Sequence, residues 1–242
     1  ADRGFVIEAV GLASSVLRHL PEGLRGDREV VAAAVRRASA ALQFAPEGFR
    51  SDRGFLLALA QHDGSVIRHV DAELRRDRDF LMSVIGEGGV ALKHAAEALR
   101  EDRSFTLAAA QLNPIALKYA VPGMRSDEDL VLSAVDADAC ALRYADARLR
   151  ESLPFVVKAV RMEGLAFKYA SSSLRGRRDA ARAAVEQDPA ALAFASPSLR
   201  ADRDFVASVL SRDGRALLHA APELRGDRAF ALRVLGESAA AL

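Results

Sequence analysis

The stretch LRADRDFVASVL, from Leu199 to Leu210, decides the fold because its pattern recurs along the whole chain at intervals of 25 residues. Its central pair, Asp202-Arg203, has counterparts at positions 2-3, 27-28, 52-53, 77-78, 102-103 and 227-228. The frame has no insertion, so the 242 residues hold nine complete repeats and 17 residues of a tenth. A fixed period of this length is typical of repeat proteins, in which each repeat packs against its neighbours.

Each repeat is predicted to contain two short helices. After Asp52, apolar residues recur at the spacing of one helix face, and the aspartate is a natural N-cap. A second start signal follows eleven residues later, where capping residues stand at Asp63, Asn113, Asp188 and Asp213. We expect a first helix of about ten residues and a second of about eight, roughly 15 Å and 12 Å long, with the second closing near a proline. These prolines are Pro46, Pro122, Pro197 and Pro222.

Helices this short are marginal in water unless they bury their apolar faces against neighbours. The sequence therefore predicts an all-α fold, an α-solenoid of about ten 25-residue helix-turn-helix repeats. We expect a single array over residues 1–242, with repeats beginning near 1, 26, 51, 76, 101, 126, 151, 176, 201 and 226. The last repeat is expected to end inside its second helix, and further repeats or a partner are expected to cap the ends of the array.

The frame L-R-x-D-R-x-F-V-L-x-A-V, followed by x-A-L-x-Y/H-A, resembles the tandem repeats of a family catalogued as domain of unknown function number 4116. The segment from Leu199 to Val206 is a good instance, and the resemblance covers essentially the whole chain. It implies helical tandem repeats of a kind found in microbial eukaryotes and some bacteria. The resemblance implies no established activity.

Composition limits the classes of partner and compartment. The chain has 34 basic and 33 acidic residues, so no global positive charge steers it to nucleic acid or anionic lipid. Cys140 is the single cysteine, which excludes an internal disulfide, and the one asparagine is followed by proline, which excludes a glycosylation acceptor. No apolar run approaches the roughly 20 residues that span a bilayer. We expect an intracellular protein without a membrane span, in an unassigned compartment.

Arginine is concentrated at the junctions between repeats. We interpret these residues first as a structural ladder, in which the arginines of position 25 bond the carbonyls that end the second helix and those of position 3 pair with acidic residues of adjacent repeats. The alternative is a stripe that binds phosphate or an acidic partner, with a second row at Arg18, Arg68, Lys93, Lys118, Arg143 and Lys168. The ladder is assigned to Arg25, Arg50, Arg75, Arg100, Arg125, Arg150, Arg200, Arg225, Asp27, Asp52, Asp77, Asp102, Asp202 and Asp227.

The same frame explains the tripeptide Arg-Gly-Asp, which occurs within LRGDR at 24–28 and at 224–228. Some extracellular adhesion proteins use this tripeptide. Here the aspartate is expected to cap the next helix, and Gly26 fills a position that other repeats give to Ser51, Arg76 or Glu101. We therefore predict a structural role and no adhesion.

Two consecutive repeats between Glu151 and Arg200 depart from the frame. Ser152-Leu153 and Arg177-Arg178 replace Asp-Arg, and Ala180 replaces phenylalanine. Drift explains these changes, but they also gather basic residues, so we predict a candidate site for an acidic partner. Restoring the frame with Arg177→Asp and Ala180→Phe is expected to raise stability. The candidate partner-binding residues are Arg175, Arg177, Arg178 and Arg182.

Other patterns suggest functions that we favour less. The pair at positions 11 and 12 of the repeat varies throughout the chain, which would suit a modular reader of nucleic acid, but exposed turns also vary freely. Four of the five histidines occupy position 19, where other repeats carry Tyr or Phe, so we expect packing and no metal site. No phosphate loop, nucleophile elbow or zinc-protease motif is present.

We therefore expect a non-enzymatic scaffold for protein-protein interaction, of a kind that can serve as one subunit of a larger assembly. We expect no catalytic, cofactor-binding or metal-binding residues and no cofactor. The alternative is a modular nucleic-acid-binding repeat protein that reads through its inter-helix turns. A regulator associated with an enzyme is the third choice. The sequence does not identify the partner.

Overall fold

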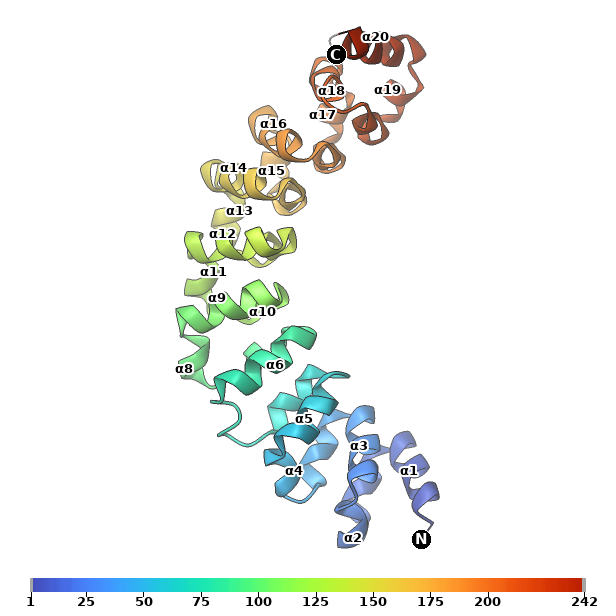
Figure 1. Ribbon diagram of the computed structural model, residues 1–242, viewed down its shortest axis with the longest axis vertical. Helices are drawn as coiled ribbons and strands as arrows, with labels where there is room; N and C mark the ends of the chain where they lie inside the picture. The colour runs from blue at the N-terminus through green and yellow to red at the C-terminus, as the bar shows by residue number, and fades with distance from the viewer. Residues whose placement is uncertain (1, 241–242) are drawn as a thin grey trace. The chain divides into compact units, whose positions relative to one another are not determined.

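The fold is an all-α repeat array, described by a computed structural model over residues 2–240 (Figure 1). Those residues contain α-helices and 3-10 helices and no strand. The chain separates into two compact parts, Ala1–Met124 and Arg125–Leu242. No helix among residues 2–240 combines the length and the apolar character that crossing a membrane requires.

The first helix of each repeat is the long one. In the first part these helices are α1 (Arg3–Leu12), α3 (Arg28–Arg37), α5 (Arg53–Ala60), α6 (Arg78–Gly88) and α9 (Arg103–Leu112). In the second part they are α12 (Glu128–Ala137), α14 (Leu153–Met162), α16 (Arg178–Gln187), α18 (Arg203–Leu210) and α20 (Arg228–Ala240). Within each part, each of these helices contacts the next along the chain, as the ribbon shows.

The second segment of most repeats is a 3-10 helix, which corrects the expected α-helix of eight residues. These segments are η1 (Ser14–His19), η2 (Ser39–Phe44), η3 (Gly64–His69), α7 (Ala91–His94) and α10 (Ile115–Tyr119), then η4 (Ala139–Tyr144), η5 (Gly164–Tyr169), η6 (Pro189–Phe194) and η7 (Gly214–His219). The 3-10 helix is used in short pieces such as these. The predicted caps are formed, for example by Asp63 on the amide of Ser65 at 2.8 Å and by Asp188 on the amide of Ala190 at 2.8 Å.

A third short helix follows in most repeats, and the two-helix prediction missed it. These helices are α2 (Glu22–Arg25), α4 (Gly48–Ser51), α8 (Glu97–Arg100), α11 (Pro122–Arg125), α13 (Ala147–Glu151), α15 (Ser172–Arg175), α17 (Pro197–Ala201) and α19 (Pro222–Gly226). Pro122, Pro197 and Pro222 are the first residues of their helices. Proline favours that position because its missing N–H would be unpaired there in any case, so these prolines start a helix shortly after the second segment has ended.

The core lies between consecutive repeats. Phe55, Phe80, Phe105, Phe155 and Phe205 are all at most 4% exposed, whereas Phe5, at the same position of the first repeat, is 67% exposed. Most second segments contribute a fully buried leucine, isoleucine or phenylalanine at position 17, such as Leu42, Ile67 or Phe167. Burial between repeats is therefore what holds these short helices in place.

The end of the array differs from expectation. The tenth repeat was expected to reach its second helix, but α20 continues as one helix to Ala240. Alanine at positions 239 and 240 favours helix continuation. Residues 241 and 242 lie outside the described part of the chain.

Candidate interaction surface

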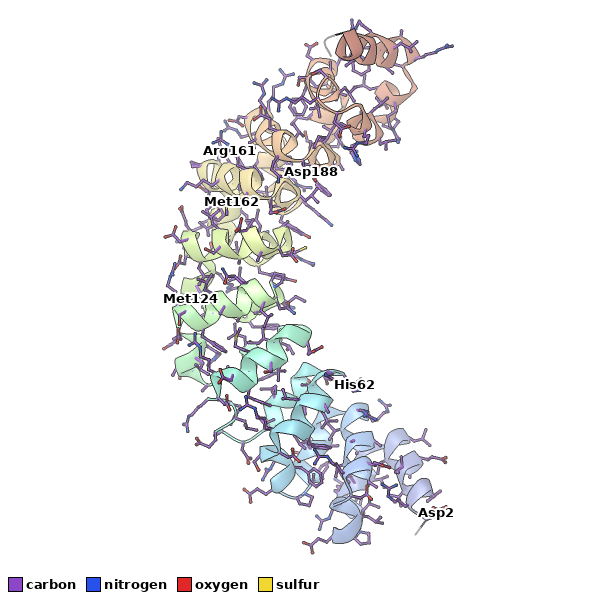
Figure 2. The ribbon with its side chains drawn as sticks, viewed as in Figure 1. Asp2, His62, Met124, Arg161, Met162 and Asp188 are labelled. Carbon is purple, nitrogen blue, oxygen red and sulfur yellow. The ribbon has the colours of Figure 1, made fainter. Side chains whose placement is uncertain are left out.

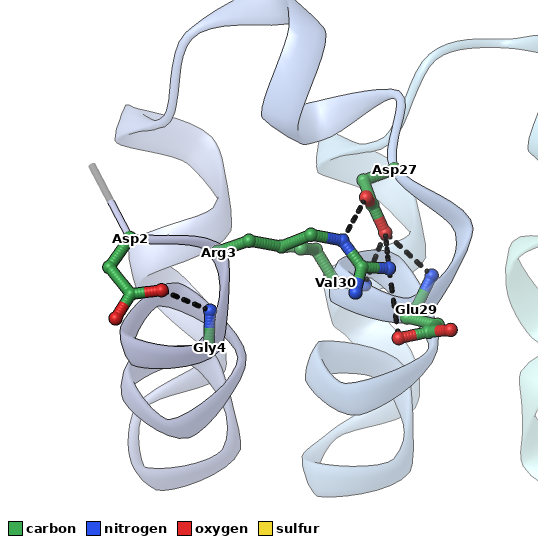
Figure 3. Close-up of polar contacts among 6 residues, drawn as sticks. All are labelled: Asp2, Arg3, Gly4, Asp27, Glu29 and Val30. Atoms are coloured by element: carbon green, nitrogen blue, oxygen red, sulfur yellow. Dashed lines mark hydrogen bonds and ion pairs between the residues drawn. The ribbon is translucent and has the colours of Figure 1, made fainter.

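At the N-termini of the first helices, arginines of position 3 pair with aspartates of position 2, and we call this set of pairs the arginine–aspartate ladder. The position-25 arginines that the sequence also assigned to a ladder have other contacts. Asp27 caps α3 by accepting the amides of Glu29 at 2.9 Å and Val30 at 3.2 Å. Arg3, from the preceding repeat, donates through Nε to the same carboxylate at 2.7 Å and lies 2.8 Å from Glu29 Oε2 (Figure 3). One aspartate thus caps its own helix and joins two repeats.

The same pairing of arginine with the aspartate of the next repeat recurs along the chain. Position 3 of one repeat pairs with position 2 of the next in Arg28–Asp52 at 2.6 Å, Arg53–Asp77, Arg78–Asp102 at 2.9 Å, Arg178–Asp202 at 2.9 Å and Arg203–Asp227. The guanidinium groups also lie 4.9 to 5.7 Å from the ring centres of buried phenylalanines, as Arg28 does over Phe55. Cations at these N-termini are therefore neutralised by the capping aspartates of the next repeat.

Hydrogen bonding lowers the pKa of Asp27, Asp52, Asp77, Asp102 and Asp227. The pKa of Asp27 falls to about 2, chiefly because Arg3 donates to its carboxylate. The pKa of Asp102 also falls to about 2, chiefly because the amide of Phe105 donates to it. The carboxylates remain ionised down to strongly acidic pH, as a cap and an ion-pair partner must.

The ladder is interrupted in the two repeats that depart from the frame. Glu128 occupies position 3 in place of arginine, and the residue at the partner position is Ser152 in place of aspartate. Leu153 also occupies position 3 in place of arginine, and the residue at its partner position is Arg177 in place of aspartate. Glu128 instead lies 3.7 Å from Lys158. Neither Ser152 nor Arg177 makes a side-chain cap bond. At both breaks, the arginine and the aspartate of the pair are both replaced. Neither helix start therefore carries a ladder arginine or a ladder aspartate without its partner.

The arginines of position 25 bind the next repeat through their backbone. Their carbonyl oxygens accept the amide of position 21 in the following repeat, at 2.8 to 3.1 Å, from Arg50, Arg75, Arg125, Arg150, Arg175 and Arg200. The counterpart for Arg25 is Pro46, which has no N–H. In the side chains, Nε is buried without a hydrogen-bond partner among the described residues in Arg25, Arg50, Arg100, Arg125, Arg150, Arg175 and Arg200.

The four candidate partner-binding arginines have different contacts in the structure and do not form one site. Arg177 pairs with Asp179, with Nη2 to Oδ2 at 2.7 Å, and Arg178 pairs with Asp202. Arg175 uses its carbonyl to hold the next repeat. Arg182 lies with Arg161 in an open hollow of about 440 Å³ between α14 and α16, and Arg161 is labelled at the end of α14 in Figure 2. Asp179 and Glu186 also line this hollow, so its charge is mixed.

The ends of the second segments carry a row of cations, which we call the position-18 row: Arg18, Arg68, Lys93, Lys118, Arg143 and Lys168. All six side chains are exposed. Among residues 2–240, none of them forms an ion pair with a carboxylate, in contrast to the ladder arginines. Gln43, Ala193 and Leu218 fill the same position in the remaining complete repeats.

Aromatic or histidine rings accompany this row at position 19. Lys118 Nζ lies 5.2 Å from the ring centre of Tyr119, and Lys168 Nζ lies 5.6 Å from those of Tyr169 and Phe194. Desolvation lowers the pKa of His69 and of His94, and the positive charges of Lys93, Arg68, His69 and Arg75 lower that of His94 further.

The variable pair at positions 11 and 12 lies at the end of the first helices and is exposed where its side chains are described. One member has a structural role, because Gln187 accepts the amide of Gly164 at 2.7 Å and donates to the carbonyl of Met162 at 3.1 Å. This contact joins two repeats.

Cys140 is exposed, and its sulfur lies 3.2 Å from the hydroxyl of Tyr169. This contact raises the pKa of Tyr169 to about 12. Within residues 2–240, no three His, Cys, Asp or Glu side chains gather as they would around a metal ion.

Comparison with known proteins identifies the repeat. The model of a family described as "Domain of unknown function (DUF4116)" matches residues 2–50, 27–75, 77–125, 127–175 and 177–225. Each match spans two of the 25-residue repeats. No curated protein and no solved structure matches the chain.

Proposed function

The chain belongs to the DUF4116 family, and we propose that it is a non-enzymatic repeat scaffold that binds other proteins, as one subunit of a larger assembly. Repeat arrays present extended surfaces in which each repeat adds one set of side chains, and such surfaces suit the recognition of extended partners. This inference proceeds from a site on the fold, because the fold alone does not define a function.

One observation carries the proposal. Ladder arginines at the helix N-termini pair with aspartates, whereas the exposed cations of the position-18 row pair with no carboxylate in the described part of the chain. The fold does not require a cation at position 18, since Gln43, Ala193 and Leu218 also occupy it. Exposed cations that serve no internal ion pair are available to a partner.

The remaining reactive groups support a role without catalysis. Asp27 and its counterparts cap helices and pair with arginine, and the thiol of Cys140 contacts a tyrosine hydroxyl rather than a basic group. A nucleophile needs an adjacent base or a lowered pKa to act. A single exposed thiol also suits a reducing intracellular compartment, which we propose as its location.

A modular nucleic-acid reader is the second candidate. The association of cations with rings at positions 18 and 19 favours it, because single strands bind to cationic grooves with stacking platforms. The variable pair favours it less. Acidic residues such as Glu87 and Asp136 occur there, and Gln187 is committed to joining two repeats.

Affinity purification of the tagged full chain, with and without nuclease treatment, tests the proposal. We expect protein partners that remain bound after nuclease digestion. Recovery only of partners that nuclease releases would overturn the scaffold function in favour of the nucleic-acid reader.

A further inference from the structure

In three consecutive repeats of the first part, the second segment ends with a cationic side chain followed by a histidine or tyrosine ring. Arg68 follows Ile67 in η3, Lys93 lies in α7 and Lys118 lies in α10, and these three segments contact one another in sequence. Each cation is exposed, and the ring that follows it, at His69, His94 or Tyr119, is half-buried. Exposed charges therefore lie beside half-buried rings in each of these repeats.

The spacing of this line indicates the shape of its ligand. Helices that pack against each other lie about 8 to 10 Å apart, and because η3, α7 and α10 contact one another in turn, we estimate a similar separation between successive cations. A polyproline II helix advances about 3.1 Å per residue with three residues per turn, so every third side chain points the same way at intervals of about 9.3 Å. A β-strand would turn every third residue to the opposite face. The spacing therefore matches polyproline II.

We propose, building on the scaffold function, that Arg68, Lys93 and Lys118 bind an acidic protein segment in the polyproline II conformation that carries a carboxylate at every third residue. The carboxylates meet the three cations, one per repeat. Prolines between them pack on the rings of position 19, as polyproline II ligands do in aromatic-lined grooves.

A nucleic acid fits this surface less well. Its affinity depends on the number of phosphates that cations neutralise, and this line offers three cations in a chain whose net charge is +1. A protein segment supplies its own apolar contacts with the rings and needs fewer charges.

Fluorescence anisotropy with the full chain tests the proposal. The probe is a labelled peptide of four Glu-Pro-Ala triplets, and its control has the same composition with the four glutamates contiguous. The variant Arg68→Gln/Lys93→Gln/Lys118→Gln removes the cations, which have no internal ion pair, so folding is preserved and is verified by circular dichroism. Arg37→Gln is the matched control because Arg37 is also exposed and unpaired among the described residues but lies at position 12.

We expect the triplet peptide to bind about tenfold more tightly than the control peptide, since three exposed ion pairs each contribute about twofold to threefold. The triple variant should lose this preference, Arg37→Gln should retain it, and added salt should weaken it. Equal binding of both peptides, or a preference that survives in the triple variant, would overturn the proposal. So would a single-stranded RNA that binds in a cation-dependent manner more tightly than the triplet peptide.

The purification experiment separates this proposal from the scaffold function. If the triple variant still recovers the nuclease-resistant partners of the wild type, those partners bind elsewhere and the position-18 proposal fails while the scaffold function stands. If neither form recovers such partners, the scaffold function itself fails.

Discussion

Replacing Asp52 by alanine tests the double role of the ladder aspartates. The carboxylate of Asp52 accepts the amide of Phe55 at 2.9 Å and Nη1 of Arg28 at 2.6 Å. Loss of an N-cap costs about 1 kcal/mol, and loss of a partly exposed ion pair costs about 0.5 kcal/mol. Asp52→Ala should therefore lower the free energy of unfolding by about 1.5 kcal/mol, or the melting temperature by about 3 to 6 °C for a chain of this size.

Asp52→Asn separates the two contributions. Asparagine caps helices about as well as aspartate but carries no charge, so it should lose only the ion-pair contribution of about 0.5 kcal/mol. The amide of Phe55 is the largest cause of the lowered pKa of Asp52, and Arg28 is the second, which agrees with the cap as the larger contribution. Ser152→Ala is the matched control, because Ser152 holds the same position without a cap bond and its loss should change little.

Urea denaturation followed by far-UV circular dichroism measures these differences. The expected order of stability is wild type, then Asp52→Asn, then Asp52→Ala, with Ser152→Ala close to wild type. If Asp52→Asn were as unstable as Asp52→Ala, the cap would not be the main contribution. If Asp52→Ala matched the wild type, the ladder would not stabilise the junction.

Three further predictions concern stability. The pKa of Asp27 is lowered to about 2, so its ionised carboxylate stabilises the folded chain fully above about pH 4. Urea denaturation at decreasing pH should show that this stabilisation is lost as the pH falls through about 2. A denaturation midpoint that does not change with acid would contradict this. Ala180→Phe should destabilise the chain by about 1 to 3 kcal/mol in thermal unfolding, because Ala180 is fully buried and Phe167, on the contacting segment η5, occupies a position that other repeats give to Leu or Ile. Adding Phe167→Leu should recover part of the lost stability. A single variant Ala180→Phe more stable than the wild type would refute the idea that Phe167 compensates for the small Ala180. Gly164→Ala should destabilise the chain because the new Cβ would lie 2.8 Å from the carbonyl oxygen of Ala184, whereas Gly123→Ala, with open space around it, should not. Equal melting temperatures for the two variants would contradict the close approach at Gly164.

The prediction for Ala180 reverses the expectation drawn from the sequence. From the sequence alone, restoring the frame with Arg177→Asp and Ala180→Phe is expected to raise stability. That reasoning treated each repeat alone. The larger Phe167 belongs to the preceding repeat, on segment η5, which contacts α16, and this contact between repeats is the basis of the new prediction.

The repeat frame and the caps could be predicted because they depend on local residues. Asp63, for example, caps the segment that begins at the next residue, which a sequence pattern shows directly. The third helix was missed because a proline after an expected helix was interpreted as a stop, although Pro197 is equally a start. The 3-10 form was missed because its residues and those of a short α-helix have similar patterns.

The pairing of the ladder could have been found in the sequence. Arginine at position 3 is replaced by Glu128 and by Leu153, and in each case the aspartate of the following repeat is also missing, at Ser152 and at Arg177. This joint loss within one chain indicates which two positions meet. The buried Nε atoms of the position-25 arginines could not be predicted, since burial depends on how consecutive repeats pack.

The position-18 row is tested most directly by footprinting its lysines. The chain has four lysines, of which Lys93, Lys118 and Lys168 belong to the row, whereas Lys158 lies on α14 beside Glu128. Mild acylation of the full chain, with and without saturating triplet peptide, is read at each lysine by mass spectrometry. We predict slower acylation of Lys93 and Lys118 with the peptide and an unchanged rate at Lys158. Protection of Lys158 alone would contradict the assignment of this row as the partner-binding surface. So would acylation rates at Lys93 and Lys118 that are the same with and without the peptide.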